Sequence, residues 1–303
     1  LVNMGDMLAM KRLRSPIRWF GGKGHMVAKI LPLFPPHRIY VEPFGGGASL
    51  LMAKAPAPVE VYNDLDSGLV NLFRVLRDEA KFERFQRLVE LTPYSREEYN
   101  DSRTWWREQF GNESDVERAY HFFVVARQGF GGRLDKGWGY IVTHSSRGMV
   151  STCSSWLSTI EGLPAMHERL MRVQIEHNDF RAILTAYDSP ETLFYCDPPY
   201  VPATRKAGGY LHEMTESDHE DLVRLLLKLK GMTVLSGYNH GTYAPLETAG
   251  WQRIDFETVC HAAGRTRGTG ILGEGASLSK QPRLESVWLS PNCGQPKLLL
   301  EEG

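Results

Sequence analysis

Apolar and polar positions divide the chain into two kinds of region. Near the start, short apolar runs at 38–41 and 59–62 have the length and β-branched content of buried strands, and 48–54 between them has helical spacing. Strand, glycine-rich turn, helix and strand in this order predict the start of an α/β sheet. The same alternation returns after residue 171. There we predict strands at 173–176, 192–195, 232–236, 253–259 and 286–289 and a helix at 217–230.

The stretch between these regions has a different pattern. Its apolar residues recur at helical spacing over 80–90 and 113–127, which is typical of amphipathic helices. A glycine-rich, basic and aromatic segment follows at 128–142, and we predict a β-hairpin there with its turn at Lys136-Gly137. The fold class is therefore predicted as α/β, with a sheet domain that a mostly helical domain interrupts. The expected bounds are 1–14 for a flexible basic N-terminus, 15–66 and 171–303 for the sheet domain, and 67–170 for the inserted domain.

Composition narrows the class of protein. The chain has 303 residues, of which 42% are hydrophobic and 23% charged, so a globular protein larger than one typical core is expected. No uncharged apolar run approaches the roughly 18 residues of a membrane helix, and we predict no membrane span. The 4 cysteines form no CxxC pair and the 10 histidines no HExxH motif. We therefore expect no metal site, reduced thiols and a cytoplasmic location.

Basic residues gather in three segments although the net charge is only -1. Segment 1–29 has six Lys or Arg residues and one acidic residue. Segment 118–150 has five basic residues and one acidic residue, and segment 261–283 has four basic residues and one acidic residue. Solvated loops would explain such segments equally well. If the partner is DNA, we expect the three segments to share one DNA-facing surface.

The most informative residues are Asp197-Pro198-Pro199-Tyr200, directly after the apolar run 192–195. This is the carboxyl end of a predicted strand, where open α/β sheets bind ligands. Two prolines stiffen the backbone, so the Asp197 carboxylate and the Pro198 carbonyl become two fixed acceptors. An exocyclic amine has two N–H donors to match them, while Tyr200 stacks on the attached ring. A plain strand-ending turn remains the alternative for these four residues alone.

Four further elements precede this loop. They are Arg18-Trp19-Phe20-Gly21-Gly22-Lys23, Val41-Glu42-Pro43-Phe44-Gly45-Gly46-Gly47, Asn63-Asp64 and Asn178-Asp179-Phe180. With the Asp-Pro-Pro-Tyr loop as hallmark, the chain resembles the Dam-type DNA adenine N6-methyltransferases, whose elements follow the same order. The resemblance covers most of residues 15–240. Five ordered elements are far harder to obtain by chance than one.

The resemblance implies S-adenosylmethionine as the cofactor of a Rossmann-like sheet. The glycine turn allows close approach of a ligand, and Asp64 is placed to accept hydrogen bonds from ribose hydroxyls, unless it caps the next helix. Lys23 would hold the cofactor's carboxylate. Asp179 and Phe180 would flank its adenine, although Asp179 alone also fits a helix cap. The expected cofactor-binding residues are Trp19, Lys23, Phe44, Gly45, Gly47, Asp64, Asp179, Phe180 and Asp197.

The implied reaction is direct in-line transfer of a methyl group to the exocyclic nitrogen of an adenine flipped out of duplex DNA. The expected catalytic residues are Asp197, Pro198 and Tyr200, with Asp197 as an acceptor and positioner more than a base. Cys196 has no neighbouring histidine and no Pro-Cys motif, so we predict a buried core thiol.

The inserted domain is expected to recognise the DNA. Its basic residues alternate with aromatic ones, a mixture suited to phosphate contacts, base reading and stacking. The family's Phe-Asn-Gly element appears only as Phe130-Gly131-Gly132, so the resemblance implies no particular recognition sequence, GATC included. The expected DNA-binding residues are Arg127, Phe130, Arg133, Lys136, Trp138 and Arg147.

Other functions remain open. A cytosine N4-methyltransferase uses the same amine chemistry, and a protein-glutamine methyltransferase uses a similar loop with Asn in place of Asp197. A catalytically silent DNA-binding homologue would keep the fold without turnover. A nicotinamide-dependent oxidoreductase would leave the loop at 197–200 unexplained. The expected partner is double-stranded DNA, joined by a cognate endonuclease in a restriction-modification setting; the sequence indicates no oligomeric state.

Overall fold

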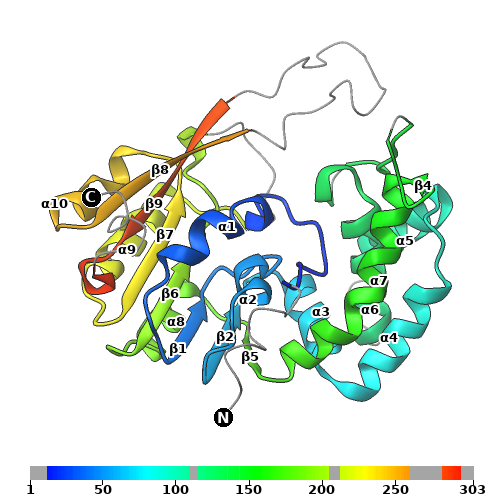
Figure 1. The fold of residues 1–303 in the computed structure, drawn as a ribbon, viewed down its shortest axis with the longest axis horizontal. Helices are drawn as coiled ribbons and strands as arrows, with labels where there is room; N and C mark the ends of the chain where they lie inside the picture. The colour runs from blue at the N-terminus through cyan, green and yellow to red at the C-terminus, as the bar shows by residue number, and fades with distance from the viewer. Residues whose placement is uncertain are drawn as a thin grey trace.

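One seven-stranded sheet and a block of helices beside it make up the described molecule (Figure 1). The computed structural model describes residues 12–108, 115–134, 136–142, 144–204, 212–259 and 282–294. The strand order is β5-β2-β1-β6-β7-β9-β8; neighbours from β5 to β7 are parallel, and β9 is antiparallel to β7 and β8. The strands are β1 Ile39–Glu42, β2 Val59–Asn63, β5 Val173–Glu176, β6 Thr192–Cys196, β7 Met232–Gly237, β8 Gln252–Val259 and β9 Pro282–Leu289.

Each strand of this sheet lies where the apolar runs predict one, and the predicted α/β class is confirmed. Successive residues of a strand face opposite sides of the sheet, so β1 places Tyr40 in one apolar cluster and Val41 in another. Burial on both faces explains why the central strands β6 and β7 are mostly apolar runs, whereas the edge strand β8 alternates. The helices beside these strands are α1 Val27–Ile30, α2 Ser49–Ala53, α8 Phe180–Ala186, α9 Glu216–Leu226 and α10 Ala244–Thr248.

Between β2 and β5 the described chain is mostly helical. The rings of Tyr62 on the sheet and Phe73 in the helices lie 4.4 Å apart, and Phe122 belongs to the same apolar cluster. The core is therefore continuous from the sheet into the helical segment. The sequence did not predict α5 and α7 separately, because α7 contains Pro164 and many serines. The helices are α3 Ser67–Arg77, α4 Glu79–Leu91, α5 Arg96–Glu108, α6 Asp115–Gln128 and α7 Ser151–Leu170.

A β-hairpin was predicted at 128–142, but the structure has it in a later segment. The segment at 128–142 has one turn of 3-10 helix and a single antiparallel bridge between Gly129 and Trp138. The hairpin instead pairs β3 Ser145–Ser146 with β4 Met149–Val150. Its turn residues Arg147 and Gly148 have φ of 56° and 74°, the left-handed pair that a tight hairpin turn needs. An X-Gly pair stands in both segments, and the sequence alone did not show which one turns.

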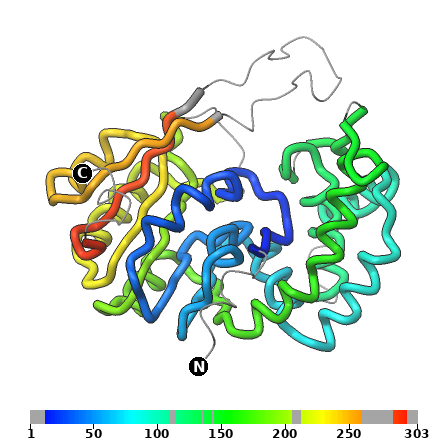
Figure 2. Tube along the Cα trace, viewed as in Figure 1, coloured from blue at the N-terminus to red at the C-terminus, as the bar shows by residue number. Residues whose placement is uncertain are grey.

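The start of the described chain, from residue 12 to the residues before α1, lies between the sheet and the helical segment (Figure 2). The Arg18 guanidinium donates to Ser155 Oγ at 3.0 Å, and a Cβ on Gly132 would meet the Arg18 carbonyl oxygen at 2.6 Å. Residues 1–11 of the first basic segment and 261–281 of the third lie outside the described residues, so the shared surface of the three segments stays a prediction. No helix in the described ranges is long and apolar enough to cross a membrane.

Candidate active site

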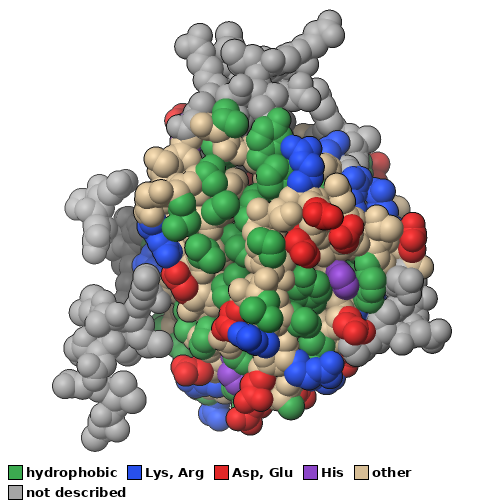
Figure 3. All heavy atoms as spheres, turned by 90° about the vertical axis from the view of Figure 1, so that its right-hand side faces the viewer, with side chains coloured by type: hydrophobic (Ala, Val, Ile, Leu, Met, Phe, Trp, Pro, Cys, Tyr) green, Lys and Arg blue, Asp and Glu red, His purple; other side chains and the backbone are tan. Residues whose placement is uncertain are grey.

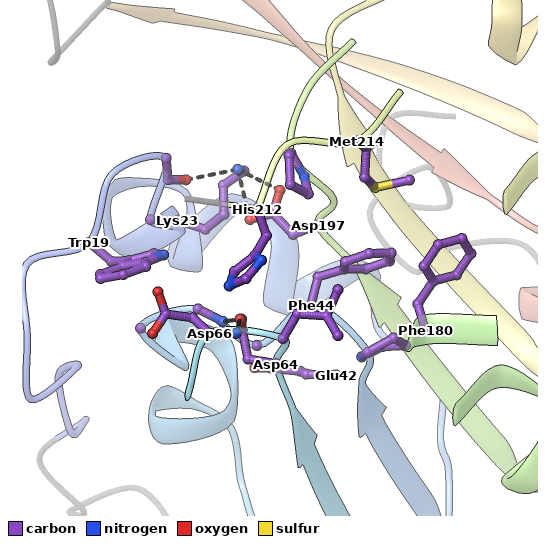
Figure 4. A pocket seen from close by; sticks show the side chains of 18 of the residues that line it. Trp19, Lys23, Glu42, Phe44, Asp64, Asp66, Phe180, Asp197, His212 and Met214 are labelled. Atoms are coloured by element: carbon purple, nitrogen blue, oxygen red, sulfur yellow. Dashed lines mark hydrogen bonds and ion pairs between the residues drawn. The ribbon is translucent and has the colours of Figure 1, made fainter. Parts of the chain in front are cut away.

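A cavity opens where the parallel strands β1, β2 and β6 reach their carboxyl ends (Figure 4). Its empty volume is about 1150 Å³, open mouth included. The turn after each of these strands contributes to its wall, together with residues 19–23, the start of α8 and residues 212–214. Every residue that the sequence assigns to the cofactor lines this one cavity, from Trp19 to Asp197. The predicted set is therefore brought together, and its role in binding stays a prediction.

The glycine turn after β1 is packed too tightly for side chains. A Cβ on Gly45 would lie 2.2 Å from the Tyr62 ring, and one on Gly47 would lie 2.8 Å from Ser15 Oγ. Gly46 has a φ of 47°, in the left-handed region. These glycines thus let the turn lie against Tyr62 and Trp19, and the same lack of side chains leaves the cavity floor open to a ligand.

Asp64 organises this turn. Its two carboxylate oxygens accept the backbone N–H groups of Gly46 and Asp66, each at 2.8 Å, and burial raises the pKa of Asp64 to about 6. The helix cap considered for Asp64 belongs to Asp66 instead, whose Oδ1 accepts from Gly68 and Leu69 at the start of α3. Asp66 also lines the cavity, and the sequence analysis missed it although Asp before a helix is a common capping signal.

Asp179 and Phe180 stand at the start of α8. Asp179 accepts the Arg181 N–H at 2.8 Å, so its capping alternative is confirmed while the residue also lines the cavity. The Phe180 and Phe44 rings lie 5.2 Å apart. Together they form an aromatic wall on one side of the cavity (Figure 4).

Asp197, directly after β6, lies in a tight polar cluster. The Lys23 ammonium is 2.6 Å from its Oδ1 and 2.8 Å from its Oδ2, and Ser236 Oγ donates to Oδ1 at 2.8 Å. Burial raises the pKa of Asp197, and the Lys23 ammonium opposes that rise. Lys23 also donates to the Gly21 carbonyl at 3.0 Å. The prediction that Lys23 holds a cofactor carboxylate is not supported, because carboxylates of the protein already neutralise it.

Pro198 and Tyr200 are buried beside Asp197 and do not line this cavity, so the catalytic roles expected for them stay predictions. Tyr200 is 7% exposed, its hydroxyl donates to Glu285, and its ring meets the Tyr238 ring edge-on at 4.5 Å. Cys196 is buried, as predicted, and burial raises the pKa of its thiol, so it is an inert core residue.

Glu42 is a second buried carboxylate in the cavity wall. It accepts the Tyr40 hydroxyl at 2.7 Å and the Leu51 N–H at 2.8 Å, and burial raises its pKa from 4.5 to about 7. The folded state therefore binds more protons than the unfolded chain between these values. Stability must fall as the pH rises through that window.

Glutamine at position 42 keeps the acceptor oxygen and has no charge to bury. We expect ligand-free Glu42→Gln to be more stable than the wild type by about 1 to 3 kcal/mol above pH 7, with no difference near pH 4.5. Thermal unfolding of both proteins across this pH range measures the effect. Parallel curves for the two proteins would show that Glu42 titrates normally.

The expected DNA-binding residues do not all reach the surface. Arg127 is 8% exposed, and its guanidinium donates to Ser155 and Thr159 between α6 and α7. The structure corrects this assignment, since such a side chain holds helices together and cannot reach a phosphate. Arg147 is exposed at the hairpin turn, where it pairs with Glu161 at 2.8 Å.

The remaining candidates surround the segment at 128–142. Lys136 is exposed, whereas Phe130 is half-buried and Arg133 lies over the Phe20 ring at 5.1 Å. Trp138 stacks on Tyr140 with 5.6 Å between ring centroids, and Arg96 lies 4.9 Å from the Trp138 ring. Sequence reasoning missed Arg96, because it begins α5 far from the basic segment. On the face that Figure 3 shows, acidic and basic side chains alternate, so that face is not a uniform phosphate-binding surface.

Comparisons with known proteins agree with this site. A family model described as D12 class N6 adenine-specific DNA methyltransferase matches residues 19–240. The type II methyltransferase M1.LlaDCHI of Lactococcus lactis subsp. cremoris is 28% identical, over 70% of this chain and 75% of its own. The DNA adenine methylase of Vibrio cholerae serotype O1 is 26% identical, over 77% of this chain and 83% of its own. The DNA N-6-adenine-methyltransferase of Escherichia phage P1 is 27% identical over 70% of this chain but only 28% of its own. A match that spans most of the chain and every element around the cavity shows that the chain belongs to the D12 class of N6 adenine-specific DNA methyltransferases.

Proposed function

We propose that this protein transfers a methyl group from S-adenosylmethionine to N6 of a specific adenine flipped out of duplex DNA. Membership of an adenine-specific family supports the reaction. The observation that carries the proposal for this chain is that its Asp-Pro-Pro-Tyr carboxylate, Asp197, lies in the wall of the cavity that all expected cofactor residues line. Action on DNA and reduced thiols are consistent with a cytoplasmic protein.

The charge of the cavity fits this cofactor better than a dinucleotide. Among the residues that the structure describes, seven carboxylates line it against two permanent cations, Lys23 and Arg181. Such a lining suits ribose hydroxyls, an amino group and a sulfonium ion, whereas it would repel a diphosphate. The acid-rich wall thus argues against the nicotinamide-dependent alternative. We assign Asp64 and Asp66 to hydroxyl or amine donors, Phe44 and Phe180 to the adenine ring, and Trp19 to the neighbourhood of the sulfonium.

S-adenosylmethionine, when bound, supplies a methyl carbon on a positively charged sulfur, which keeps the C–S electron pair as the methyl group leaves. The protein's task is to hold the adenine amine in line. Asp197 and the Pro198 carbonyl accept the two N–H groups, which leaves the nitrogen lone pair free to form the N–C bond. The nitrogen would then carry the positive charge and lose a proton, which the Asp197 carboxylate, as its hydrogen-bond acceptor, could take up.

Reaching an adenine in a duplex requires the base to leave the stack, at a cost of a few kcal/mol that DNA contacts must offset. We propose Arg133, Lys136, Arg147 and Arg96 as contacts to phosphates or bases, with Trp138 as a stacking surface. The Arg147–Glu161 pair is solvent-exposed, so a phosphate can replace its partner at little cost.

Transfer of tritiated methyl groups to duplex DNA, followed by identification of the modified nucleoside, tests the proposal. The expected product is N6-methyladenine at one sequence context. N4-methylcytosine would establish the cytosine-specific alternative instead. Absence of transfer, together with absence of cofactor binding in calorimetry, would identify a silent homologue. A methyl-sensitive endonuclease encoded beside the protein would complete the restriction-modification setting.

A further inference from the structure

Glu285 is a buried acid that no part of the proposed mechanism uses. It lies on β9 and is 4% exposed. This position is outside residues 19–240, which the family model matches. Buried carboxylates are rare unless they are paired, so the partners of Glu285 indicate its function.

One of its two partners, Lys23, lines the cavity, and the other, Tyr200, ends the Asp-Pro-Pro-Tyr loop. The Tyr200 hydroxyl donates to Glu285 Oε1, and the Lys23 ammonium lies 3.4 Å from the same oxygen. Lys23 is also 4.7 Å from the centre of the Tyr200 ring. The same ammonium binds Asp197 at 2.6 Å. Glu285 therefore contacts the far end of the Asp-Pro-Pro-Tyr loop directly and its first residue through Lys23.

Among the residues that the structure describes, the cluster has one ammonium, that of Lys23, for two carboxylates. Its formal charge is -1 when Lys23 is protonated and both acids are ionised, and the cluster is buried, where charges interact strongly. A negative cluster favours a positive charge beside it. Methyl transfer carries a positive charge from sulfur to the adenine nitrogen, next to Asp197. The excess carboxylate thus suits both the start and the end of that transfer.

We propose that Glu285 is a positioning residue for methyl transfer, which fixes the Tyr200 hydroxyl and shares the Lys23 ammonium with Asp197. This inference rests on the proposed function of the site. Sharing Lys23 leaves Asp197 less completely neutralised, so it remains a strong acceptor for the adenine amine. Holding Tyr200 fixes the other end of the loop whose Pro198 carbonyl is the second acceptor.

The proposal predicts a specific effect on Asp197. Burial is the main cause that raises the pKa of Asp197, Lys23 lowers it, and the negative charge of Glu285 raises it. Without that charge the pKa of Asp197 must fall, since Lys23 then serves one carboxylate. The cluster and the elements packed against it contain several titratable groups. They are Lys23, Glu42 on β1, Tyr195 and Cys196 on β6, Asp197, Tyr200, Tyr238 after β7, Tyr243 in the short helix 241–243, and Glu285 on β9.

The test compares Glu285→Gln with the wild type and with Glu257→Gln, an exposed position on the neighbouring strand β8. Glutamine keeps an oxygen for the Tyr200 hydroxyl and loses only the charge. We expect a single-turnover rate of methyl transfer to DNA roughly tenfold lower, with unchanged KM for DNA. Carboxyl carbon NMR of the ligand-free protein should show Asp197 titrating at lower pH. Glu257→Gln should match the wild type in both measurements.

An unchanged rate in folded Glu285→Gln would overturn the inference, as would a slower rate with an unchanged Asp197 titration, which is what a merely structural residue would give. If Glu285→Gln does not fold, Tyr200→Phe removes the hydroxyl contact alone. The Tyr200→Phe protein must then transfer the methyl group more slowly than the wild type, with an unchanged KM for DNA. A wild-type rate in this variant would overturn the inference. A wild-type protein that methylates no DNA would instead refute the proposed function.

Discussion

Replacing Asp197 with asparagine is expected to lower the single-turnover rate of DNA methylation by about 100-fold to 1000-fold. Asparagine has the same shape but no charge, and Lys23, only 2.6 Å from the carboxylate, then has Glu285 as its remaining acidic partner in the described structure. The acceptor for the adenine amine becomes weaker, and the positive charge that develops on the amine is no longer balanced. Rapid-quench measurement with tritiated cofactor and duplex DNA gives the rate.

Binding must be measured beside the rate. Because Asp197 acts on the amine in the reaction, the Kd for DNA should change far less than the rate. Glu191→Gln is the matched control, since Glu191 is exposed immediately before β6, the strand that carries Asp197 at its other end. Wild-type turnover in a folded Asp197→Asn protein would refute the assigned mechanism.

Replacing Glu60 with glutamine is expected to destabilise the protein by about 3 to 5 kcal/mol. Glu60 on β2 binds the Lys54 ammonium at 2.7 Å and the Arg169 guanidinium at 2.5 Å, and none of the three side chains is more than 6% exposed. Arg169 also donates to the Leu51 carbonyl at 2.9 Å, so the cluster joins the sheet to α7. Removing the one acid leaves two buried cations without compensation. Urea unfolding at about pH 7 gives the free energy.

The pH dependence of this loss follows from the pKa of Glu60. Burial acts to raise it, but hydrogen bonds and ion pairs with Arg169 and Lys54 outweigh burial and lower it. The stabilisation is therefore complete above the unfolded pKa and is lost as the pH falls through the folded one. The difference between wild type and Glu60→Gln should shrink in acid. Exposed Glu83→Gln on α4 should cost almost nothing, and a cost equally small at Glu60 would contradict the prediction.

Local pattern predicted the central strands of the sheet well because they are buried on both faces. A run such as 192–195 is apolar at every position, and only a central strand satisfies that pattern. The hairpin was misplaced because turn position depends on which glycine takes a positive φ, and Gly148 does so without any distinctive neighbour. The helix at 151–170 was not predicted separately, because its stability comes from packing against the other helices rather than from favourable helix-forming residues.

The cavity residues were predictable because they lie in turns after strands, in motifs with a fixed order. Their partners were not. Glu285 lies 88 positions after Asp197 in a strand with no motif, and Lys23 is in a motif that did not show which group its ammonium binds. Contacts of this kind depend on how distant strands are placed side by side. Arg127 shows the converse, since a basic residue in a basic segment is buried by its own helix packing.

The continuous apolar core between sheet and helices limits how this protein changes its target site during evolution. A DNA-recognition domain that is joined to its catalytic domain only by a linker can be replaced as a whole by another such domain. Here Tyr62 and Phe73 pack together across the junction, so a transplanted helical block would have to match the sheet's own side chains. If the hairpin and the segment at 128–142 contact the DNA, as proposed above, substitutions at exposed positions such as Lys136 and Arg147 would change those contacts without disturbing the core.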